Sequence, residues 1–392
     1  MTTSPALPPG IRRLQFRAAG VGVLALLACA FGAFVNPAQF FQSYLEGYLF
    51  WIGVSLGCLG ILMLYYLVGG SWGVPALRLL EAGARTLPLM ALLFLPFAAG
   101  MHHLYPWARP EDVAAHRLIR EKQLYLNLPG FWIRTGAYFA IWLTLTGFLT
   151  RWSLAQDRRA DVSLAIREKV LSAPGLILYG LTMTFAAIDW AMSLEPEWYS
   201  TIFGMLLIAA QGLQAMTFVI LVAALLVRFG PLVEAGTVSR FKDLGNLTLA
   251  FLMLWMYMAF SQLLIVWAEN LNEEIPYYLH RIAGGWDVLA LLIFGLQFAL
   301  PFFLLLFRAV KCSIRVLPVI AGWILMMNYA YVFWMVAPTF HPAGFSVHWM
   351  DLAAPIGIGG VWIGLFLRLL QSRALIPLHD PRIQAGLQHA EG

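Results

Sequence analysis

Apolar runs long enough to cross a membrane recur along the whole chain and alternate with short polar segments. A helix needs about 20 apolar residues to span a hydrocarbon core about 30 Å thick. The pattern predicts an all-α, polytopic integral membrane protein with about ten transmembrane helices, in which spans two to five and six to nine could form two four-helix bundles beside two peripheral helices. The runs lie at residues 16–35, 44–68, 84–104, 130–150, 171–193, 200–227, 243–268, 281–308, 314–337 and 347–371.

The same pattern predicts the domain organisation. One transmembrane domain is expected at 16–371, between an N-terminal tail of residues 1–15 and a C-terminal tail of residues 372–392. Prolines interrupt three of the spans, which membranes tolerate where neighbouring helices satisfy the freed backbone groups. These prolines are Pro88, Pro96, Pro174 and Pro355.

Composition supports the membrane assignment. Hydrophobic residues make up 61% of the 392 residues and charged residues 11%, whereas soluble domains are nearer one half apolar and one quarter charged. The 15 Trp and 14 Tyr suit aromatic belts at the two membrane surfaces. The net charge of +5 is too small to indicate a nucleic-acid partner.

The positions of Lys and Arg predict the orientation. If the N-terminus is inside, all but six of the 25 Lys and Arg fall in inner segments. Positive residues favour the cytoplasmic side of a membrane, and an even number of spans then places both termini in the cytoplasm. The six exceptions are Arg109, Arg117, Arg120, Lys122, Arg134 and Arg281.

Two segments between the spans carry many charges. Residues 105–128 form an outer loop with both charge signs, which suits a surface helix or a docking face. Residues 151–170 are basic and amphipathic, and they are expected to form a helix that lies on the anionic inner leaflet.

The cysteines exclude several cofactors. Cys29, Cys58 and Cys312 lie far apart, and none belongs to a CxxC or CxxCH unit. This spacing argues against a zinc site, an iron–sulfur cluster or a c-type haem within the chain. Arginines before an apolar run that ends at Cys29 also resemble a lipoprotein cleavage site, but a first transmembrane helix explains the same residues.

Ionisable residues within the spans gather near their outer ends. Such groups are costly inside a membrane and are functional candidates by default. Each alone is explained equally well as an interfacial anchor that extends to the membrane surface. Together they mix carboxylates, histidines and an arginine on several helices at one depth, which predicts a shared site. They are His102, His103, Arg134, Asp189, Glu195, Glu269, Asp287, His348 and Asp351.

Two spans carry small and hydrogen-bonding residues along one face. In span five they are Ser172, Gly175, Tyr179, Thr182, Ala186, Asp189 and Ser193, and in span seven Asp243, Asn246, Ala250, Tyr257 and Ser261, with Glu269 beyond them. Steps of three and four place such residues on one side of a helix. The stripes suit a hydrated proton path, although the same residue types also favour ordinary helix packing in membranes.

An outer cluster of this kind suits the oxidation of a quinol. That reaction needs an apolar slot for the ring, hydrogen-bond partners for its two oxygens, and a base for its protons. A partly desolvated carboxylate or a histidine can act as this base. Four tryptophans beside the polar positions could wall the slot, although aromatic belts explain them as well. They are Trp190, Trp198, Trp286 and Trp349.

Two sequence blocks resemble a known family. The first is Asp189–Gly204, with the sequence DWAMSLEPEWYSTIFG, and the second runs from Lys242-Asp243-Leu244-Gly245-Asn246 through Trp255, Tyr257, Phe260-Ser261-Gln262, Trp267 and Asn270 to Glu273-Glu274. Both resemble the NrfD/polysulfide-reductase-like integral membrane family, and within it the F-type (ActF) membrane subunits of alternative complex III, a bacterial quinol:electron-acceptor oxidoreductase. The resemblance covers about residues 16–371.

The resemblance implies a subunit of the bacterial cytoplasmic (inner) membrane that binds no redox cofactor of its own. Its partners would be the surrounding lipid, a second NrfD-like membrane subunit, an iron–sulfur protein, and multihaem and monohaem cytochromes c. Those partners would carry electrons from quinol to an acceptor such as cytochrome c. The chain itself would translocate protons, bind quinone, or do both.

The resemblance also ranks the candidate residues. Asp189 and Glu195 belong to the first block, and Asp243 and Glu269 lie in or beside the second. Asp189 is the expected proton-handling group. Arg134, Asp287, His348 and Asp351 are nominated by their depth and chemistry alone.

Three other functions compete with this interpretation. A b-type haem anchor would need facing histidines at mid-membrane depth, but His102, His103, His280, His341 and His348 all lie at span ends. A secondary transporter would show paired broken helices and polar groups at the midplane, where the chain offers Gln211, Gln214, Gln262 and Asn328. A non-catalytic scaffold would only bind redox partners at its outer face.

Overall fold

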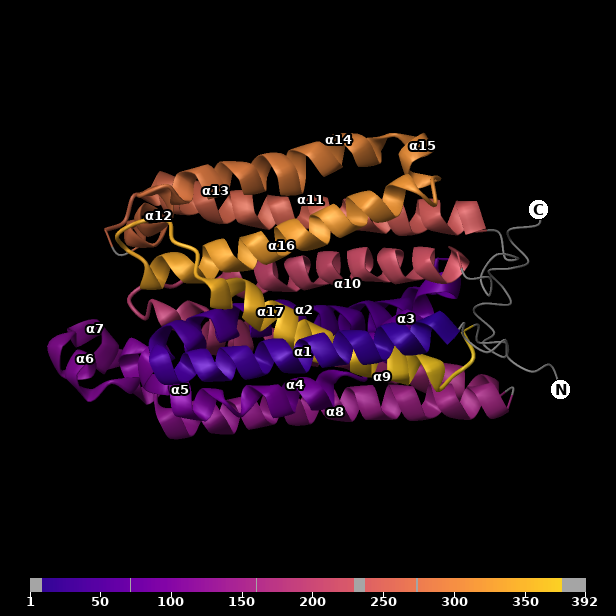
Figure 1. Cartoon of the computed structure of the whole chain (residues 1–392), viewed down its shortest axis with the longest axis horizontal. Helices are drawn as coiled ribbons and strands as arrows, with labels where there is room; N and C mark the ends of the chain where they lie inside the picture. The colour runs from indigo at the N-terminus through magenta and orange to yellow at the C-terminus, as the bar shows by residue number, and fades with distance from the viewer. Residues whose placement is uncertain (1–8, 71, 160, 229–236, 273, 376–392) are drawn as a thin grey trace.

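Long helices run side by side along the molecule (Figure 1). The computed structural model describes residues 9–70, 72–159, 161–228, 237–272 and 274–375, and it contains no strand in these ranges. The long helices are α1 (Pro9–Val35), α2 (Pro37–Val68), α8 (Leu128–Arg158), α9 (Val162–Trp190), α10 (Phe203–Arg228), α11 (Thr237–Glu269), α16 (Val316–Phe340) and α17 (Trp349–Gln371).

Shorter helices complete the chain. Two spans are built from several pieces, namely α3 (Gly73–Ala84), α4 (Leu87–Phe94) and α5 (Phe97–Leu104), and α13 (Trp286–Leu292), the π-helical segment η4 (Ile293–Ala299) and α14 (Leu300–Leu306). The connecting helices are η1 (Pro106–Ala108), α6 (Pro110–Ala115), α7 (Arg117–Glu121), η2 (Lys122–Leu124), η3 (Met192–Leu194), α12 (Ile275–Ile282) and α15 (Arg308–Lys311).

The chain is a multi-spanning membrane protein. Within the described residues, eight helices are long and apolar enough to cross a bilayer, and a bent helix pair raises the number to nine. The remaining predicted span, residues 130–150, lies inside α8, which is long enough but has its hydropathy lowered by threonines, tryptophans and an arginine. The helical class is confirmed, and the expected number of about ten spans is consistent with it.

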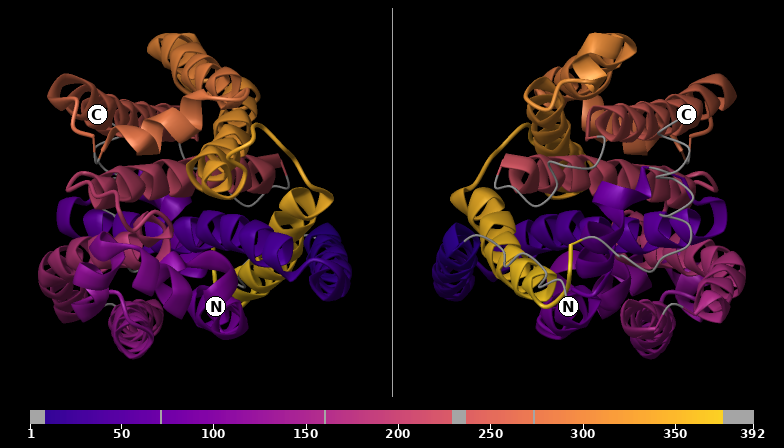
Figure 2. Two further views of the ribbon diagram at one scale, coloured as in Figure 1. Left: turned by 90° about the vertical axis from the view of Figure 1, so that its left-hand side faces the viewer. Right: turned by 90° about the vertical axis from the view of Figure 1, so that its right-hand side faces the viewer.

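The helices form two groups that meet at α2 and α10. The segments α2, α3–α5, α8 and α9 pack together, and so do α10, α11, α13–α14 and α16. Helices α1 and α17 pack against each other at the side, next to α2 (Figure 2). This arrangement agrees with the predicted pair of four-helix bundles and two peripheral helices.

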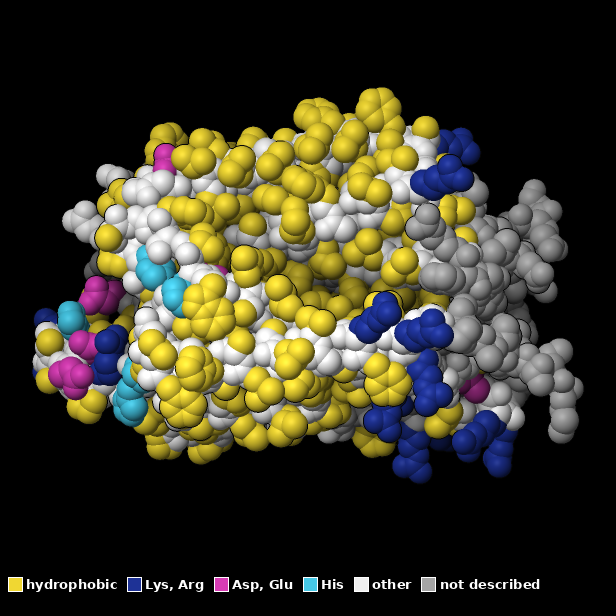
Figure 3. Space-filling view, in the orientation of Figure 1, with side chains coloured by type: hydrophobic (Ala, Val, Ile, Leu, Met, Phe, Trp, Pro, Cys, Tyr) yellow, Lys and Arg dark blue, Asp and Glu magenta, His cyan; other side chains and the backbone are white. Residues whose placement is uncertain are grey.

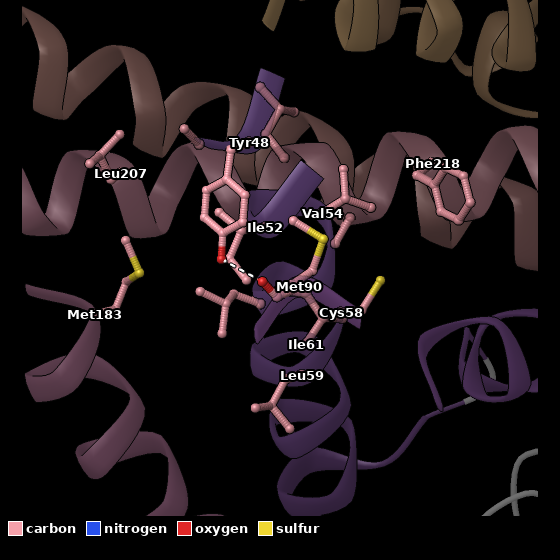
Figure 4. Close-up of a cluster of buried hydrophobic side chains, with 14 of the residues drawn as sticks. Tyr48, Ile52, Val54, Cys58, Leu59, Ile61, Met90, Met183, Leu207 and Phe218 are labelled. Carbon is pink, nitrogen blue, oxygen red and sulfur yellow. Dashed lines mark hydrogen bonds between the residues drawn. The ribbon is translucent and has the colours of Figure 1, made fainter. Parts of the chain in front are cut away.

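The core follows α2 through the centre of the molecule. Almost every residue of α2 from Tyr44 to Met63 is buried, because this helix contacts both groups and both peripheral helices. Figure 4 shows part of this core, where the Tyr48 hydroxyl donates a hydrogen bond of 3.0 Å to the carbonyl of Met90. Close packing of this kind is the main source of helix association inside a membrane.

The third span begins earlier than the hydropathy pattern predicts and is bent. Residues 73–84, expected to belong to an inner loop, form α3, and all twelve are buried. The chain bends by 69° between Phe94 and Phe97. Pro96 lies at this bend, and a proline removes a helical hydrogen bond and clashes with the preceding turn.

The two charged segments between the spans differ in outcome. Residues 105–128 form a chain of four short helices, η1, α6, α7 and η2. The predicted surface helix at 151–170 was wrong, because α8 continues to Arg158 and α9 starts at Val162. No helix breaker interrupts 151–158, and the Asp161 carboxylate then caps α9 by accepting from the Ser163 amide at 2.8 Å.

Glycines allow α1 and α17 to touch through their backbones. A methyl group on Gly22 would lie 2.5 Å from the Val361 nitrogen, and one on Gly360 would lie 2.5 Å from the Ala18 oxygen. Small residues permit this close approach between membrane helices.

The Gly22→Leu substitution is therefore expected to push α1 away from α17. Overpacking of this kind costs about 2 kcal/mol, which should lower the unfolding temperature of the detergent-solubilised protein. Gly20→Leu is the matched control, because nothing lies within 4 Å of a methyl group at Gly20 on the same helix. Equal unfolding temperatures for the two variants would contradict the packing argument.

Candidate functional site

Most sequence candidates lie at one end of the molecule, called here the loop end, which is formed by α5–α7, η3 and α12 (Figure 1). The opposite end, where α1 begins and α17 finishes, is called the terminal end. On the face shown in Figure 3, histidines and carboxylates gather at the loop end, whereas Lys and Arg gather at the terminal end.

Asp189 is the centre of a buried ion pair at the loop end. The Arg134 guanidinium binds it through two nitrogens, with Nε 2.9 Å from Oδ2 and Nη2 2.8 Å from Oδ1. The Tyr138 hydroxyl donates to Oδ2 at 2.8 Å. Asp189 is fully buried and the Arg134 side chain is 21% exposed. Both carboxylate oxygens of Asp189 are therefore hydrogen-bonded, and two of these bonds come from a charged partner.

The elements around this pair hold Arg134 in place. Arg134 lies in the second turn of α8, whose start is capped by the Asn127 side chain. Its Nη1 donates to the Tyr125 carbonyl at 2.9 Å, and its guanidinium carbon lies 3.9 Å from the centre of the Tyr125 ring. Asp189 comes one residue before the end of α9. Helices α8 and α9 therefore close the site from both sides.

Glu195 forms a second, separate network at the loop end. Its Oε1 lies 2.7 Å from Arg281 Nη1 and accepts from the Thr339 hydroxyl at 2.7 Å, while Oε2 lies 3.4 Å from His280 Nδ1. Arg281 is buried and also donates to the Met335 carbonyl at 2.6 Å. The network joins the segment after η3 to α12 and α16.

A cavity of about 420 Å³ opens beside Glu195. Trp198 and Tyr277 form one wall, with their rings stacked at 3.8 Å and an angle of 11°. His280 and His116 also line it. The cavity therefore combines one aromatic wall with two imidazoles, the Arg109 guanidinium and the carboxyl groups of Asp112, Glu195 and Glu197.

Asp351 forms the third network, between α17 and α2. Its Oδ1 accepts from the Ser43 hydroxyl at 2.5 Å and from Gln39 Nε2 at 3.0 Å, and its Oδ2 accepts from the His348 amide at 2.6 Å. His348 in turn caps α17 by accepting from the Met350 amide. His348 and Asp351 thus form a capping box at the start of α17.

Five of the predicted candidates are distributed over these three networks. The structure places Arg134 with Asp189, Glu195 with Arg281, and His348 with Asp351, in three networks that lie between different helices. The side chains of His102, His103, Tyr257, Glu269 and Asp287 are exposed at the surface, and those of Asp243 and Ser261 are half-buried. These exposed positions fit the alternative of interfacial anchors.

The polar stripes predicted for spans five and seven differ in burial. On α9, Ser172, Tyr179, Thr182 and Asp189 are all buried, and so is Ser193 of η3. The Tyr179 hydroxyl donates to Gln211 at 2.7 Å, and Trp142 donates to Thr182 at 2.8 Å. On α11, by contrast, Asn246, Ala250 and Tyr257 are exposed. Only the α9 stripe faces the protein interior.

The aromatic candidates divide in the same way. Trp190, Trp198 and Trp286 are buried, whereas Trp349 is 49% exposed. Trp190 lies among other rings, including Phe94 at 5.0 Å and Phe139 at 5.9 Å between ring centres. It is part of the core of the first bundle, which is formed by α2, α3–α5, α8 and α9. Trp190 therefore does not line an open slot.

The polar residues near mid-depth join neighbouring helices. Gln214 donates to Asn328 at 2.8 Å, from α10 to α16. Gln262 accepts from the Ser200 hydroxyl at 3.1 Å and donates to Tyr278 at 3.2 Å. The Gln214–Asn328 and Gln262–Tyr278 contacts are interhelical hydrogen bonds of the kind that stabilises membrane bundles, whereas Ser200 lies in the segment between η3 and α10.

A buried ionic network occupies the terminal end of the first bundle. Glu81 of α3 binds Arg78 at 2.8 Å and Arg373 at 3.0 Å, and it accepts from the Tyr66 hydroxyl at 3.1 Å. Arg78 also pairs with Asp157 of α8. The network fixes the segment after α17 to α3 and α8.

Sequence reasoning missed several members of these networks. Tyr138 follows Arg134 by one helical turn, so the spacing on span four was a usable signal. Glu46 stands two residues inside the predicted span 44–68, and it is buried. Glu81 and Arg78 were assigned to a loop, because charges are typical of loops between spans.

Comparisons with known proteins do not indicate a family. No protein-family model matches the chain, and no curated protein matches it.

Proposed function

We propose that this chain is a proton-handling integral membrane subunit of a quinol:electron-acceptor oxidoreductase complex. The observation that carries the proposal is Asp189, a fully buried carboxylate at the loop end of the polar face of α9. An ionisable group at such a position in a membrane protein is functional by default. The redox complex is proposed because the sequence block Asp189–Gly204 resembles the F-type membrane subunits of alternative complex III.

The interior of the first bundle offers polar groups between its two ends. At the terminal end, Glu168 lines a small cavity together with Arg78, Ser153 and Asp157. Ser172 follows one turn later, and then Tyr179, Thr182 and Asp189 continue along α9. Two intervals of seven residues, each about 10 Å along the helix, separate Ser172 from Tyr179 and Thr182 from Asp189.

Thr146 of α8 lies opposite the first of these intervals. The bond between Trp142 and Thr182, and the approach of the Leu145 side chain to Gly175, set the antiparallel register of α8 and α9. That register places Thr146 between Ser172 and Tyr179. Its buried hydroxyl has no hydrogen-bond partner among the described side chains and backbone groups, so it supports a water-assisted transfer across the interval.

In this proposal the terminal end faces the cytoplasm of a bacterial cell. The gathering of Lys and Arg at that end (Figure 3) supports this orientation through the preference of positive residues for the inner side. Asp189 then lies near the outer surface, where partner subunits with iron–sulfur clusters and c-type haems would receive electrons. The chain itself would carry no redox cofactor.

Quinol binding beside Glu195 is a second proposed role. The cavity of about 420 Å³ has an aromatic wall, and the Glu195 carboxylate and the His280 imidazole, 3.4 Å apart, could accept the two protons of a quinol. The Glu195→Gln variant should then raise the KM for quinol in the purified complex.

Purification of the tagged chain in a mild detergent tests the complex. We expect an iron–sulfur protein, multihaem and monohaem c-type cytochromes and a second, related membrane protein to co-purify, with a haem spectrum in the same sample. A colourless chain that purifies alone would overturn the assignment and favour a transporter.

The Asp189→Asn variant tests the proton role within the assembled complex. A positioned proton acceptor contributes at least about a hundredfold to a rate, so we expect quinol-driven proton release from proteoliposomes to fall by at least about tenfold. Glu111→Gln, an exposed position on α6, is the matched control. An assembled Asp189→Asn complex with unchanged proton release would favour a scaffold.

A further inference from the structure

Glu46 is a carboxylic acid deep inside the molecule. It lies nine residues after the start of α2, which is about 14 Å along the helix, and it is only 1% exposed. Asp351 of α17, which is 3% exposed, accepts from Ser43, which lies nearly one turn before Glu46 on α2, and a methyl group on Gly47 would lie 3.1 Å from the Ala354 carbonyl carbon. Helices α2 and α17 pack directly against each other, so the two carboxyl groups share one environment.

These two groups differ from the other buried carboxylates of the networks. Asp189, Glu195 and Glu81 each bind an arginine, at 2.7 to 2.8 Å. Neither Glu46 nor Asp351 forms an ion pair with any Lys, Arg or His in the described part of the chain. Two neighbouring carboxylates without a cation cannot both be ionised at low cost, because like charges repel and burial removes their hydration.

Hydrogen bonding decides which member holds the proton. Asp351 accepts from Ser43, Gln39 and the His348 amide, and several donors of this kind stabilise the charged form. The Glu46 Oε2 atom is buried and accepts no hydrogen bond from the described residues. Tyr329 of α16 is a further titratable group beside this pair, since its hydroxyl donates to the Asp351 carbonyl.

We propose that Glu46 holds a proton at neutral pH beside an ionised Asp351, so that the pair forms a proton-binding site between α2 and α17. This site is separate from the Arg134–Asp189 pair between α8 and α9. The inference deepens the proposed function, since it names a second proton-binding site. The test of this site measures the protonation of a carboxyl group and does not require quinol turnover. The experiments can therefore refute the Glu46 site and the proposed function independently of each other.

An apolar groove gives membrane-soluble reagents a route toward the pair. The groove, of about 520 Å³, runs between α1, α2, α16 and α17. Phe50, one turn after Glu46, and Pro355, one turn after Asp351, line it together with Tyr329. Figure 3 shows a hollow lined by hydrophobic side chains between α16 and α1. A small apolar reagent dissolved in the bilayer can therefore approach Glu46.

Dicyclohexylcarbodiimide is a suitable probe, because it is apolar and reacts with the protonated form of a buried carboxyl group. The acid proton moves to a carbodiimide nitrogen while a carboxyl oxygen bonds to the central carbon. The adduct then rearranges to a stable acylurea, and no group leaves. We expect native membranes containing the chain to yield this adduct on the peptide that carries Glu46, and the yield to fall as the pH is raised.

Asp189, Glu81 and Glu195 provide the control within the same sample, because each pairs with an arginine and Glu46 does not, so these three should remain unlabelled. Infrared spectroscopy of the purified protein is a second readout. The Glu46→Gln variant should lose absorption of a carboxylic-acid C=O group that Asp189→Asn retains.

Either a Glu46 adduct or the loss of that absorption supports the proposal. Labelling of Asp351 in place of Glu46 would overturn the assignment of the proton. The absence of an adduct at Glu46, together with an unchanged carboxylic-acid absorption in Glu46→Gln, would overturn the site as a whole.

Discussion

The Asp189→Ala variant is expected to lose about 3 kcal/mol of folding free energy, because it leaves a positive charge without its partner. Arg134 would lose two hydrogen bonds to the carboxylate, and Tyr138 would lose its acceptor. The figure is at the lower end for a buried pair, since the Arg134 side chain keeps 21% of its surface exposed. Thermal unfolding in detergent measures the loss.

A double variant separates stability from proton transfer at this pair. Replacing both partners of a buried pair with apolar residues is often neutral for stability, so Arg134→Met combined with Asp189→Leu should recover most of the unfolding temperature. Proton release by the complex should remain low in the double variant. If stability and proton release returned together, the role of Asp189 would be structural only.

The Glu81→Ala variant is expected to be the most destabilising carboxylate substitution, at about 4 kcal/mol. Glu81 lies between Arg78 and Arg373, whose side chains are 3% and 7% exposed. Without it, the two guanidinium groups lose the anion that they share, and Asp157 remains as a partner for Arg78 alone. We expect a lower unfolding temperature and a lower yield of folded protein.

Glu121→Ala is the matched control for this prediction. Glu121 pairs with Arg117 at 2.7 Å, but both side chains are largely exposed. Water screens such surface pairs, which contribute little to stability, so no measurable change is expected. A comparable loss of stability in both variants would show that burial of the Glu81 network is not the source of its effect.

Hydropathy predicted the helical class and most span positions, because each span must be apolar for about 20 residues. It failed at α3, where Arg78 and Glu81 are typical of a loop. Arg78 and Glu81 pair with each other three residues apart, but their further partners Asp157 and Arg373 lie far away in sequence. No local pattern contains those distant contacts, so the depth of α3 could not be predicted.

The sequence predicted which residues are candidates for the site, but it did not predict which of them contact one another. Asp189 was identified because a carboxylate ends a polar stripe, and the buried face of α9 agrees with that pattern. On α11 the same spacing joins exposed residues such as Tyr257. The periodicity of a sequence shows which side chains share a helix face, but it does not show what packs against that face. Glu46 gained its significance only when α17 brought Asp351 beside it.

The contact between α1 and α17 has a consequence for biogenesis. Proteins fold from the N-terminus during synthesis, so α1 enters the bilayer early, whereas the glycines that receive it, among them Gly360, are translated near the end. Until then the small-residue face of α1 around Gly22 has only lipid beside it. Closure of the helix bundle therefore waits for the last helix, and a chain truncated before α17 would present that face to quality-control proteases of the membrane.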